Sequence, residues 1–370
     1  MKSKYTGKVA LFVPALGGGG AQRVMTILAS GLSEANVQVD LVLANATGPY
    51  LNDIPSHVNV VDLKGGRILT SIHRLMLYLK NENPSVMLST VAHANVAALL
   101  AKRFSGSSTK LFIRVENTIS IATADEKGFR SKILLYLIRK LYPWANGVVA
   151  PSQGVADDLK QEFNISEDLI SVIYNPVVRP EIYEKAKCEI KHPWFNAGEP
   201  PVIISVGRLT KQKDYATLIN ALSIVNKKQQ ARLIILGEGE DRNELTSLIT
   251  KLNLQDYVDL AGFVDNPYAY MAKSNVYVLS SLWEGLPNTL IEAMAVGLPI
   301  VATDCKSGPK EILLNGKYGW LSPTGSASSI AEGIIQALSS DAFPMPDSES
   351  LQLFQREKIV DKYLNLLLAD

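Results

Sequence analysis

Short apolar runs alternate with amphipathic helical patterns along most of this 370-residue chain. An apolar run of about four to eight residues is typical of a buried strand, and apolar residues spaced by three or four are typical of a helix that covers a sheet. When each strand is followed by a helix, the chain crosses over the sheet and consecutive strands run parallel. The predicted fold class is therefore α/β with doubly wound parallel sheets.

The predicted elements fall into two groups. In the first group, strands are expected near residues 8–14, 37–44, 58–62, 86–90, 110–115, 146–150 and 170–173, and helices near 20–33, 68–80, 94–103, 129–141 and 152–163. In the second group, strands are expected near 202–206, 232–236, 257–260, 275–280 and 298–302, and helices near 214–227, 240–252, 266–273, 288–296, 308–314 and 326–338. The tail, residues 351–368, also has helical spacing of its apolar side chains.

The alternation breaks once, in a polar stretch with prolines at 176, 180, 193, 200 and 201. Proline lacks a backbone donor and interrupts helices and strands, so this stretch predicts a connector. We expect a Rossmann-like domain at 1–176, a connector at 177–200 and a second Rossmann-like domain at 201–345. Ligands bind such sheets at the carboxyl ends of the strands, so the two domains are expected to face each other across a binding cleft.

The charge of the chain is nearly balanced overall but differs between its two halves. Residues 1–176 contain 18 Lys and Arg against 13 Asp and Glu, a net charge of +5, whereas residues 177–370 have a net charge of −4. A basic first domain suits an anionic partner such as a lipid surface or a pyrophosphate-bearing acceptor, although so small an imbalance also arises by chance. No nucleic-acid partner is predicted.

The two cysteines, Cys188 and Cys305, form neither a disulfide framework nor a metal motif. No run of about 18 apolar residues predicts a membrane span. The start, Lys2 to Leu16, is basic and then apolar like a signal peptide, but the apolar part is short and ends in glycines, which favours a buried first strand. We therefore expect a cytoplasmic protein.

Two carboxylates, Glu284 and Glu292, stand eight residues apart around a turn and the start of an apolar helix. The preceding strand places Glu284 on the loop at the carboxyl edge of a sheet and Glu292 about one turn into the helix. The helix start suits phosphate, and carboxylates accept hydrogen bonds from sugar hydroxyls. The segment predicts a nucleotide-sugar site that comprises Gly285, Leu286, Pro287, Asn288, Thr289, Leu290 and Glu292, with Glu284 beside it.

Four glycines, Gly17 to Gly20, follow the first strand and open a helix. Without a Cβ, glycine lets backbone N–H groups approach a phosphate closely, so Gly18 and Gly19 are predicted to contact the donor. The run is neither G-x-G-x-x-G nor a Walker loop, which disfavours a dinucleotide or ATP-type site. A flexible turn without ligand contact is the alternative.

Arg208 and Lys213 lie five residues apart on a loop between a strand and a helix. A guanidinium fork and a compact ammonium together match a diphosphate, which is the role predicted for both, whereas Lys211 is expected to be solvated. Gly237, at the end of another strand, is predicted to allow close approach of a base or ribose.

Three residues of the first domain are candidates for the chemistry or for acceptor binding. His93 is expected on the loop after the strand at 86–90, with a role at the sugar or the leaving group; a structural histidine is the alternative. Glu116 could hold or activate an acceptor hydroxyl, or it could form a salt bridge with Arg114. The sequence has no Asp-x-Asp motif and no cluster of His and Cys, so neither a catalytic metal nor a cofactor is predicted.

Taken in order, these motifs resemble those of family 4 glycosyltransferases of the GT-B fold. The matches cover almost the whole chain and include Gly-Ala-Gln-Arg at 20–23, Val-Val-Ala-Pro-Ser at 148–152, Asn175-Pro176, Gly207-Arg208 with Lys213, Gly237-Glu-Gly, Gly262-Phe-Val, Glu284 with Glu292, and Gly297-x-Pro299-Ile-Val. Residues 281–288 and 305–311 are similar to those of bacterial enzymes that build surface polysaccharides or lipid-linked oligosaccharides.

The resemblance implies a retaining, metal-independent transfer of a hexose or N-acetylhexosamine from a nucleotide sugar, usually UDP-linked. Arg208 and Lys213 would bind the diphosphate, Glu292 the ribose hydroxyls, and Glu284 the sugar hydroxyls near the anomeric carbon. The acceptor would be a glycan or a polyprenyl-diphosphate-linked glycan. The helix at 351–370 would pack back on the first domain.

Where related enzymes often carry Glu-His, this chain has Val115-Glu116-Asn117, and the residues that flank His93 also depart from the family pattern. The acceptor side is therefore expected to differ.

Residues 65–80 and 131–144 combine basic with apolar side chains, which predicts weak binding to anionic membranes and a peripheral location on the inner face of the cytoplasmic membrane. The alternative is that both are ordinary helices whose apolar faces lie in the core.

Two other functions fit the same residues. An epimerase or hydrolase of the GT-B fold would consume a UDP-sugar without an acceptor. A non-catalytic scaffold would bind the nucleotide sugar without consuming it, although the intact Glu284, Glu292, Arg208 and Lys213 argue against such decay.

Overall fold

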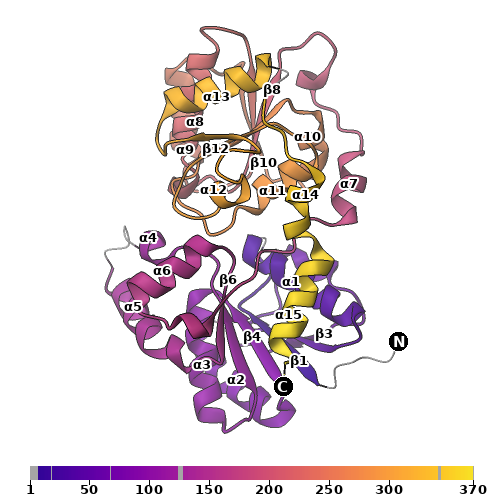
Figure 1. The fold of residues 1–370 in the computed structure, drawn as a ribbon, viewed down its shortest axis with the longest axis vertical. Helices are drawn as coiled ribbons and strands as arrows, with labels where there is room; N and C mark the ends of the chain where they lie inside the picture. The colour runs from indigo at the N-terminus through magenta and orange to yellow at the C-terminus, as the bar shows by residue number, and fades with distance from the viewer. Residues whose placement is uncertain (1–6, 18, 67, 124–127, 341–342, 370) are drawn as a thin grey trace. The chain divides into compact units, whose positions relative to one another are not determined.

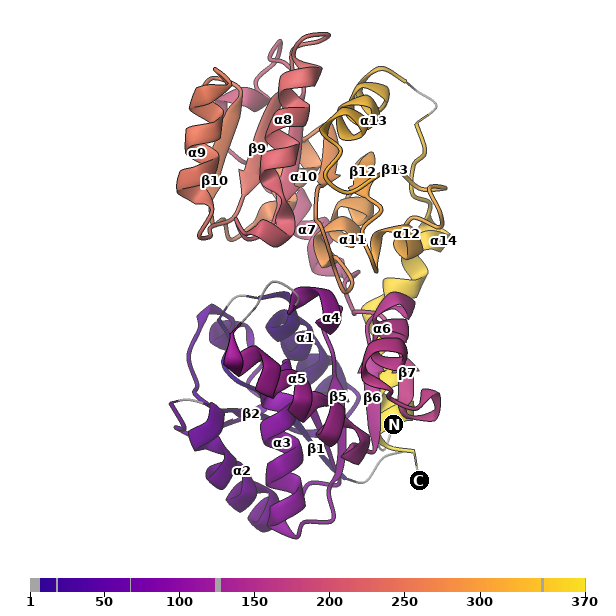
Figure 2. The same cartoon turned by 90° about the vertical axis from the view of Figure 1, so that its left-hand side faces the viewer.

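The computed structural model describes residues 7–17, 19–66, 68–123, 128–340 and 343–369. The chain divides into two compact units, Met1–Pro176 with Phe354–Asp370, and Val177–Leu353 (Figures 1 and 2). Each unit contains one parallel sheet, of seven strands in the first and six in the second. The predicted α/β class with two Rossmann-like domains is confirmed.

The sheet of the first unit has the strand order β3-β2-β1-β4-β5-β6-β7. Its strands are β1 (Lys8–Val13), β2 (Gln38–Leu43), β3 (Asn59–Asp62), β4 (Val86–Thr90), β5 (Lys110–Arg114), β6 (Gly147–Ala150) and β7 (Ile170–Val172). Its α-helices are α1 (Gly20–Glu34), α2 (Ile68–Glu82), α3 (Ala92–Ser105), α4 (Ile119–Ala122), α5 (Phe129–Leu141), α6 (Gln153–Phe163) and α15 (Arg356–Leu367). Short 3-10 helices are η1 (Pro49–Asp53), η2 (Tyr142–Trp144) and η3 (Glu167–Leu169).

Successive residues of β1 point to opposite faces of this sheet, as in any strand. Ala10 and Phe12 join one apolar core with helices α2, α3, α5 and α6, and Leu11 joins the other with α1 and α15. Both faces are therefore covered, which explains why β1 is apolar at consecutive positions. The C-terminal helix α15 contacts α1, and Gly31 of α1 lies close to Val360 of α15 (Figure 1).

The sheet of the second unit has the strand order β10-β9-β8-β11-β12-β13. Its strands are β8 (Val202–Val206), β9 (Arg232–Leu236), β10 (Val258–Gly262), β11 (Val276–Leu279), β12 (Ile300–Thr303) and β13 (Trp320–Ser322). Its α-helices are α7 (Pro180–Ala186), α8 (Tyr215–Val225), α9 (Arg242–Lys251), α10 (Pro267–Lys273), α11 (Asn288–Ala295), α12 (Pro309–Ile312), α13 (Ala327–Ser339) and α14 (Ser348–Leu351). Short 3-10 helices are η4 (Pro193–Phe195), η5 (Lys211–Lys213) and η6 (Gln352–Phe354).

Helices α8, α9 and α13 share one apolar core with the strands of this sheet, and α10 and α11 contact β8 and β11 (Figure 2). The stretch predicted as a connector, 177–200, is part of this unit and carries α7 and η4. Prolines 180 and 193 stand at the first position of each, where the missing N–H costs nothing, so they begin helices rather than interrupt them. The second unit also extends beyond the predicted end at 345, to Leu353.

In each sheet, one pair of neighbouring strands marks the point at which the strand order reverses. These are β1 and β4 in the first unit and β8 and β11 in the second. Ligands of doubly wound sheets bind outside the carboxyl ends of such a pair. The loops that follow these four strands are therefore where a site is expected.

Among the described residues, no helix has the length and apolar character that a membrane crossing requires.

Candidate active site

The loop after β8 and the loop after β11 are tied together in the second unit. The N–H of Leu282 donates to the carbonyl of Gln212 at 2.8 Å, and Nε2 of Gln212 donates to the carbonyl of Trp283 at 2.9 Å. Oγ of Ser280 donates to the carbonyl of Lys213 at 2.7 Å. These bonds fix the backbone of two segments that lie about 70 residues apart in the chain, so the side chains of the two loops are held at fixed positions relative to each other.

Lys213 and Glu284 form an ion pair across these two loops. Nζ of Lys213 lies 2.5 Å from Oε1 of Glu284, which also accepts a hydrogen bond from Oγ of Ser281 at 2.7 Å. The side chains are only 18% and 8% exposed, so each charge depends on the other for compensation. The sequence predicted a diphosphate role for the lysine and a sugar role for the carboxylate, and the structure brings both to one point.

Arg208 belongs to the same loop but is exposed, and it forms no ion pair or hydrogen bond with the residues that the structure describes. The loop continues into η5, and Asp214 then caps α8 by accepting from the N–H of Thr217 at 3.3 Å. Burial raises the pKa of Asp214. Of the two cations predicted to bind the diphosphate, Lys213 is thus fixed by a carboxylate, and Arg208 faces solvent, where an anionic group can reach it.

Glu292 lies one turn into α11 and is 2% exposed. Its Oε1 accepts a hydrogen bond from Oη of Tyr268 on α10 at 2.9 Å. The two glutamates predicted as a site are therefore both buried, each with a donor that the sequence did not predict to be its partner.

The turn between the glutamates leads into the N-terminus of α11. Pro287 occupies the N-cap position and offers no side-chain cap, and Thr289 shares a 2.7 Å hydrogen bond with Tyr277. The side chain of Leu290 is fully buried, and its N–H donates to the carbonyl of Pro287 at 3.2 Å. Asn288 and Thr289 are thus better placed than Leu290 for a ligand at this helix start.

A third loop, after β12, packs on this turn. Oγ of Ser307 donates to the carbonyl of Gly285 at 2.8 Å, and a Cβ on Gly308 would lie 2.5 Å from Cδ of Pro287. Leu286, between them, is buried. Burial and, next, the nearby Glu284 raise the pKa of the Cys305 thiol to about 12, so this cysteine is an inert packing residue.

Gly237 has a positive φ of +146°, and a Cβ at this position would lie 1.9 Å from the carbonyl oxygen of Gly207. The glycine is therefore required by the close approach of the loops after β8 and β9. The N–H of Leu209 donates to the carbonyl of Glu238 at 2.9 Å across the same contact. From the sequence, Gly237 was predicted to allow close approach of a base or ribose. The nearby Gly207 carbonyl is enough to explain why a glycine stands here, and donor contact at Gly237 stays a prediction.

In the first unit, the glycine loop lies after β1, at the reversal point of the sheet. Gly17 is exposed, and a Cβ there would meet no atom within 4 Å. Gly19 is the N-cap of α1 without a side-chain cap, and a Cβ there would lie 2.3 Å from Oε1 of Gln22. Gly18 lies outside the described residues.

His93 lies in the first turn of α3, not on a loop, because the helix begins at Ala92. The turn into the helix is made by Val91, whose φ of +77° is strained for a β-branched residue. Glu116 accepts hydrogen bonds from the N–H of Val91 and, at 2.7 Å, from Oγ1 of Thr90. Desolvation lowers the pKa of His93, and the charge of Glu116 acts in the opposite direction.

Arg114 does not pair with Glu116. Its guanidinium is buried and donates to Oδ1 of Asn175 at 2.6 Å and to Oγ1 of Thr90 at 3.4 Å. The salt bridge considered from the sequence is therefore wrong, and Glu116 instead holds the strained turn before His93. Val91 was missed from the sequence, where nothing distinguishes it from an ordinary strand-end residue.

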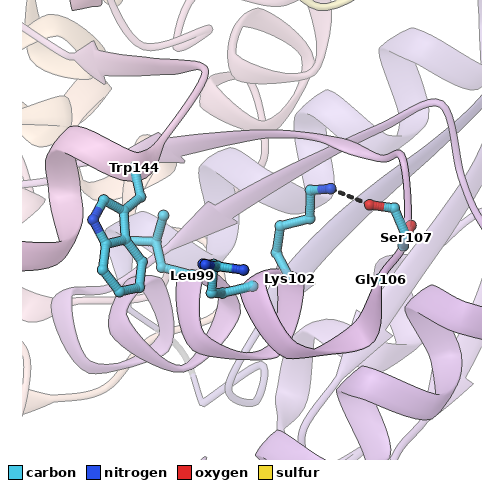
Figure 3. Close-up of a pocket in the computed structure, with 6 residues that line it drawn as sticks. Leu99, Lys102, Gly106, Ser107 and Trp144 are labelled. Atoms are coloured by element: carbon cyan, nitrogen blue, oxygen red, sulfur yellow. Dashed lines mark hydrogen bonds between the residues drawn. The ribbon is translucent and has the colours of Figure 1, made fainter.

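A separate pocket of about 310 Å³ lies at the other end of α3 (Figure 3). Figure 3 shows Trp144 at one side and the hydrogen bond from Lys102 to the carbonyl of Ser107 at the other. None of the predicted site residues lines it. Within the described part of the chain, no three His, Cys, Asp or Glu side chains cluster as metal ligands would.

Comparison with known proteins places this chain in a family. The pattern of the "Glycosyltransferase Family 4" group matches residues 18–179, and that of "Glycosyl transferases group 1" matches residues 187–351. An N-acetylgalactosamine-N,N'-diacetylbacillosaminyl-diphospho-undecaprenol 4-alpha-N-acetylgalactosaminyltransferase of Campylobacter jejuni is 33% identical over 98% of this chain and 100% of its own. The chain belongs to the family 4 glycosyltransferases of the GT-B fold.

Two further proteins are similar to this glycosyltransferase. The amylovoran biosynthesis glycosyltransferase AmsD of Erwinia amylovora is 29% identical over 81% of each chain. The crystal structure of Anabaena HepE in complex with UDP and glucose has a TM-score of 0.81 at 18% identity, and the match covers 98% of this chain and 99% of HepE. The second likeness concerns the fold alone.

Proposed function

We propose that this glycosyltransferase takes a hexose or N-acetylhexosamine from a UDP-sugar and transfers it, with retention and without a metal, to a glycan or lipid-linked glycan of bacterial surface-polysaccharide synthesis. The observation that carries the proposal is the Lys213–Glu284 pair at the reversal point of the second sheet, 2.5 Å apart and tied to the start of α11. A cation and a carboxylate at one point match the two halves of a nucleotide sugar, its diphosphate and its sugar hydroxyls.

The charges that develop during transfer fit these residues. When the bond to the anomeric carbon breaks, negative charge grows on the diphosphate while the sugar ring becomes cationic. Arg208, Lys213 and the N-terminus of α11 would stabilise the diphosphate, and such preorganised groups can replace a metal. Glu284 already binds Lys213 and Ser281, which supports a role as hydrogen-bond acceptor for the sugar rather than as a nucleophile. Attack on the same face, with a diphosphate oxygen as base, then gives retention.

The donor and acceptor classes draw support from the similar proteins. HepE binds UDP and glucose in its crystal structure, and the C. jejuni relative is named for an acceptor linked to undecaprenol through a diphosphate. AmsD is named for the synthesis of a polysaccharide, amylovoran. The basic first domain of this chain, with a net charge of +5, suits a diphosphate-bearing acceptor.

A lipid-linked acceptor would require the enzyme to meet a membrane, and α5 with η2 presents a suitable surface. Phe129, Ile133, Tyr136 and Trp144 are exposed along it, with Phe129 79% exposed. The exposed Lys132, Arg139 and Lys140 accompany them. An aromatic and basic stripe of this kind binds the interface of an anionic bilayer. The observation favours membrane contact over the reading that the apolar side chains of this segment all lie in the core.

Incubation of the purified enzyme with UDP-N-acetylgalactosamine, UDP-N-acetylglucosamine, UDP-glucose and UDP-galactose tests the proposal. We expect one donor to be consumed only when a polyprenyl-diphosphate-linked glycan is present, and the product to keep the anomeric configuration in its NMR spectrum. Consumption of a donor without acceptor would indicate an epimerase or hydrolase. Binding without consumption under all conditions would indicate a scaffold.

Chelation tests the absence of a metal from the reaction. Transfer should keep most of its rate in excess EDTA, because Arg208 and Lys213 supply the positive charge at the diphosphate. Complete loss of transfer, restored by Mg²⁺ or Mn²⁺ but not by salt of equal ionic strength, would contradict this part of the proposal.

A further inference from the structure

The carboxylate of Glu292 is held from outside its own helix. Oη of Tyr268, on α10, donates to Oε1 of Glu292 at 2.9 Å, and the tyrosine is 1% exposed. Nη2 of Arg179 in turn donates to Oη of Tyr268 at 3.1 Å. A chain of two hydrogen bonds therefore runs from the segment before α7, through α10, to α11.

The direction of the protons in this chain is fixed by chemistry. A guanidinium has no acceptor, so the tyrosine hydroxyl must accept a hydrogen bond from Arg179 and donate its only proton to Glu292. A hydrogen bond to a carboxylate is strong, and the Arg179 cation polarises the Tyr268 hydroxyl and strengthens this bond further. Arg179 is itself anchored, because Nη1 donates to the carbonyl of Val177 at 3.0 Å and Nε lies 3.8 Å from Oε2 of Glu181.

We propose that Tyr268 is a positioning residue that holds Glu292 in the orientation that accepts hydrogen bonds from the ribose hydroxyls of the donor. The inference rests on the proposed function and on the contact between Glu292 and the ribose hydroxyls that the family resemblance implies. A glutamate has several rotatable bonds, and ordering it in advance removes that entropic cost from donor binding. Tyr268 thereby sets the preference of the enzyme for a ribonucleotide over a nucleotide that lacks the ribose hydroxyls.

Tyr268→Phe removes one hydroxyl and keeps the packing of the ring. We expect the affinity for UDP, measured by calorimetry, to fall about fivefold to tenfold. The affinity for 2′,3′-dideoxy-UDP should change less than about twofold, because that ligand has no hydroxyl for Glu292. The turnover at saturating donor should stay near the wild-type value, since ribose contacts are similar in the ground and transition states.

Tyr257→Phe is the matched control. Its hydroxyl accepts from Nε2 of Gln230 at 3.1 Å near the surface of the same unit, so its loss should leave both affinities unchanged. Arg179→Met keeps the stem of the side chain and removes its donors, and it should lower the preference for ribose less than Tyr268→Phe does. An equal loss of affinity for UDP and for 2′,3′-dideoxy-UDP in Tyr268→Phe would show a merely structural role and overturn the inference.

Glu292→Gln separates this inference from the proposed function. If Glu292→Gln loses the preference for ribose while Tyr268→Phe keeps it, the positioning role is wrong and the assignment of Glu292 stands. If Glu292→Gln keeps the full preference, the assignment of Glu292 to the ribose is wrong, and the inference falls with it.

Discussion

The carboxyl edges of the two sheets differ in how far their side chains are already engaged. In the second unit, Lys213 pairs with Glu284 and Tyr268 with Glu292, and backbone bonds tie the loops after β8 and β11 together. In the first unit, Glu116 and Arg114 are engaged near the ends of β4 and β5, but the loop after β1 holds glycines, with open space beside Gly17. At the reversal point of the second sheet, side chains after both strands are therefore fixed, whereas the loop after β1 in the first sheet offers backbone groups and open space.

Both edges also carry residues with positive φ. At the first edge, Val91 is held by Glu116, and the result is a helix start that carries His93. At the second edge, positive φ falls on Gly237, which tolerates it, and on Asp214 and Ser307 in the loops after β8 and β12. The comparison supports the proposal that fixed charges of the second unit bind the donor and that the first unit binds the acceptor. The predictions below would sharpen or break this contrast.

The largest effect is expected at the two basic residues that are proposed to bind the diphosphate. Lys213→Ala and Arg208→Ala should each lower turnover by about 10²- to 10³-fold, the scale for loss of a preorganised charge stabiliser. Lys213→Ala should also lower the free energy of unfolding by roughly 1–3 kcal/mol, because it leaves the buried Glu284 without this hydrogen-bond donor, whereas Arg208→Ala should unfold like the wild type. Lys211→Ala, on the same loop, is the control. Wild-type transfer by both variants would remove the diphosphate site from this edge.

The two glutamates should separate by kinetic parameter. Glu284→Gln should lower turnover by about 10²-fold, because the sugar contact strengthens as the ring becomes cationic. Glu292→Gln should raise the KM for the donor about tenfold and leave turnover near the wild-type value, because ribose contacts do not change during the reaction. Steady-state kinetics with the donor as varied substrate measures both. The reverse pattern would exchange their roles.

A smaller effect is expected in the first unit, at His93. His93→Ala should lower turnover about tenfold, the scale of one hydrogen bond to the sugar or leaving group. Because desolvation lowers the pKa of His93, the ring is neutral at pH 7, and it gains its proton only when the pH falls below that lowered value. Activity that depends on the neutral ring should therefore be flat near pH 7 and decline at acidic pH. The decline should be absent from the pH profile of His93→Ala; an unchanged profile would make His93 structural.

The smallest effects are expected at the surface of α5. Each basic residue near an anionic bilayer contributes about 1 kcal/mol, so Lys132→Glu with Lys140→Glu should abolish flotation of the enzyme with anionic vesicles at low salt. The same reversal at two exposed lysines of the second unit, Lys227 and Lys228, should leave flotation unchanged. Transfer to a water-soluble acceptor should be normal in both variants. Equal loss of flotation in the two variants would mean that the net charge of the protein, and not the stripe on α5, attracts the membrane.

Local pattern predicted most of the fold. The strands at β1, β4 and β8 begin and end within one residue of the predicted ranges, because each is a compact apolar run. The pattern missed β13, which has only three residues, and α7, whose proline at the first position was taken as an interruption. It also started α3 two residues late, since nothing in the sequence announces the positive φ of Val91.

The sequence by itself determined which residues stand at the ends of strands, because the alternation of strands and helices fixes where each loop falls. Arg208, Glu284 and His93 became site candidates in this way, although His93 lies in the first turn of α3 and not on a loop. Only the tertiary structure decided which of those loops are neighbours, because strand order is set by crossovers that no local pattern encodes. Lys213 and Glu284 are 71 residues apart in the chain and Tyr268 and Glu292 are 24 apart, so their pairing comes from the packing of β8 beside β11 and of α10 against α11.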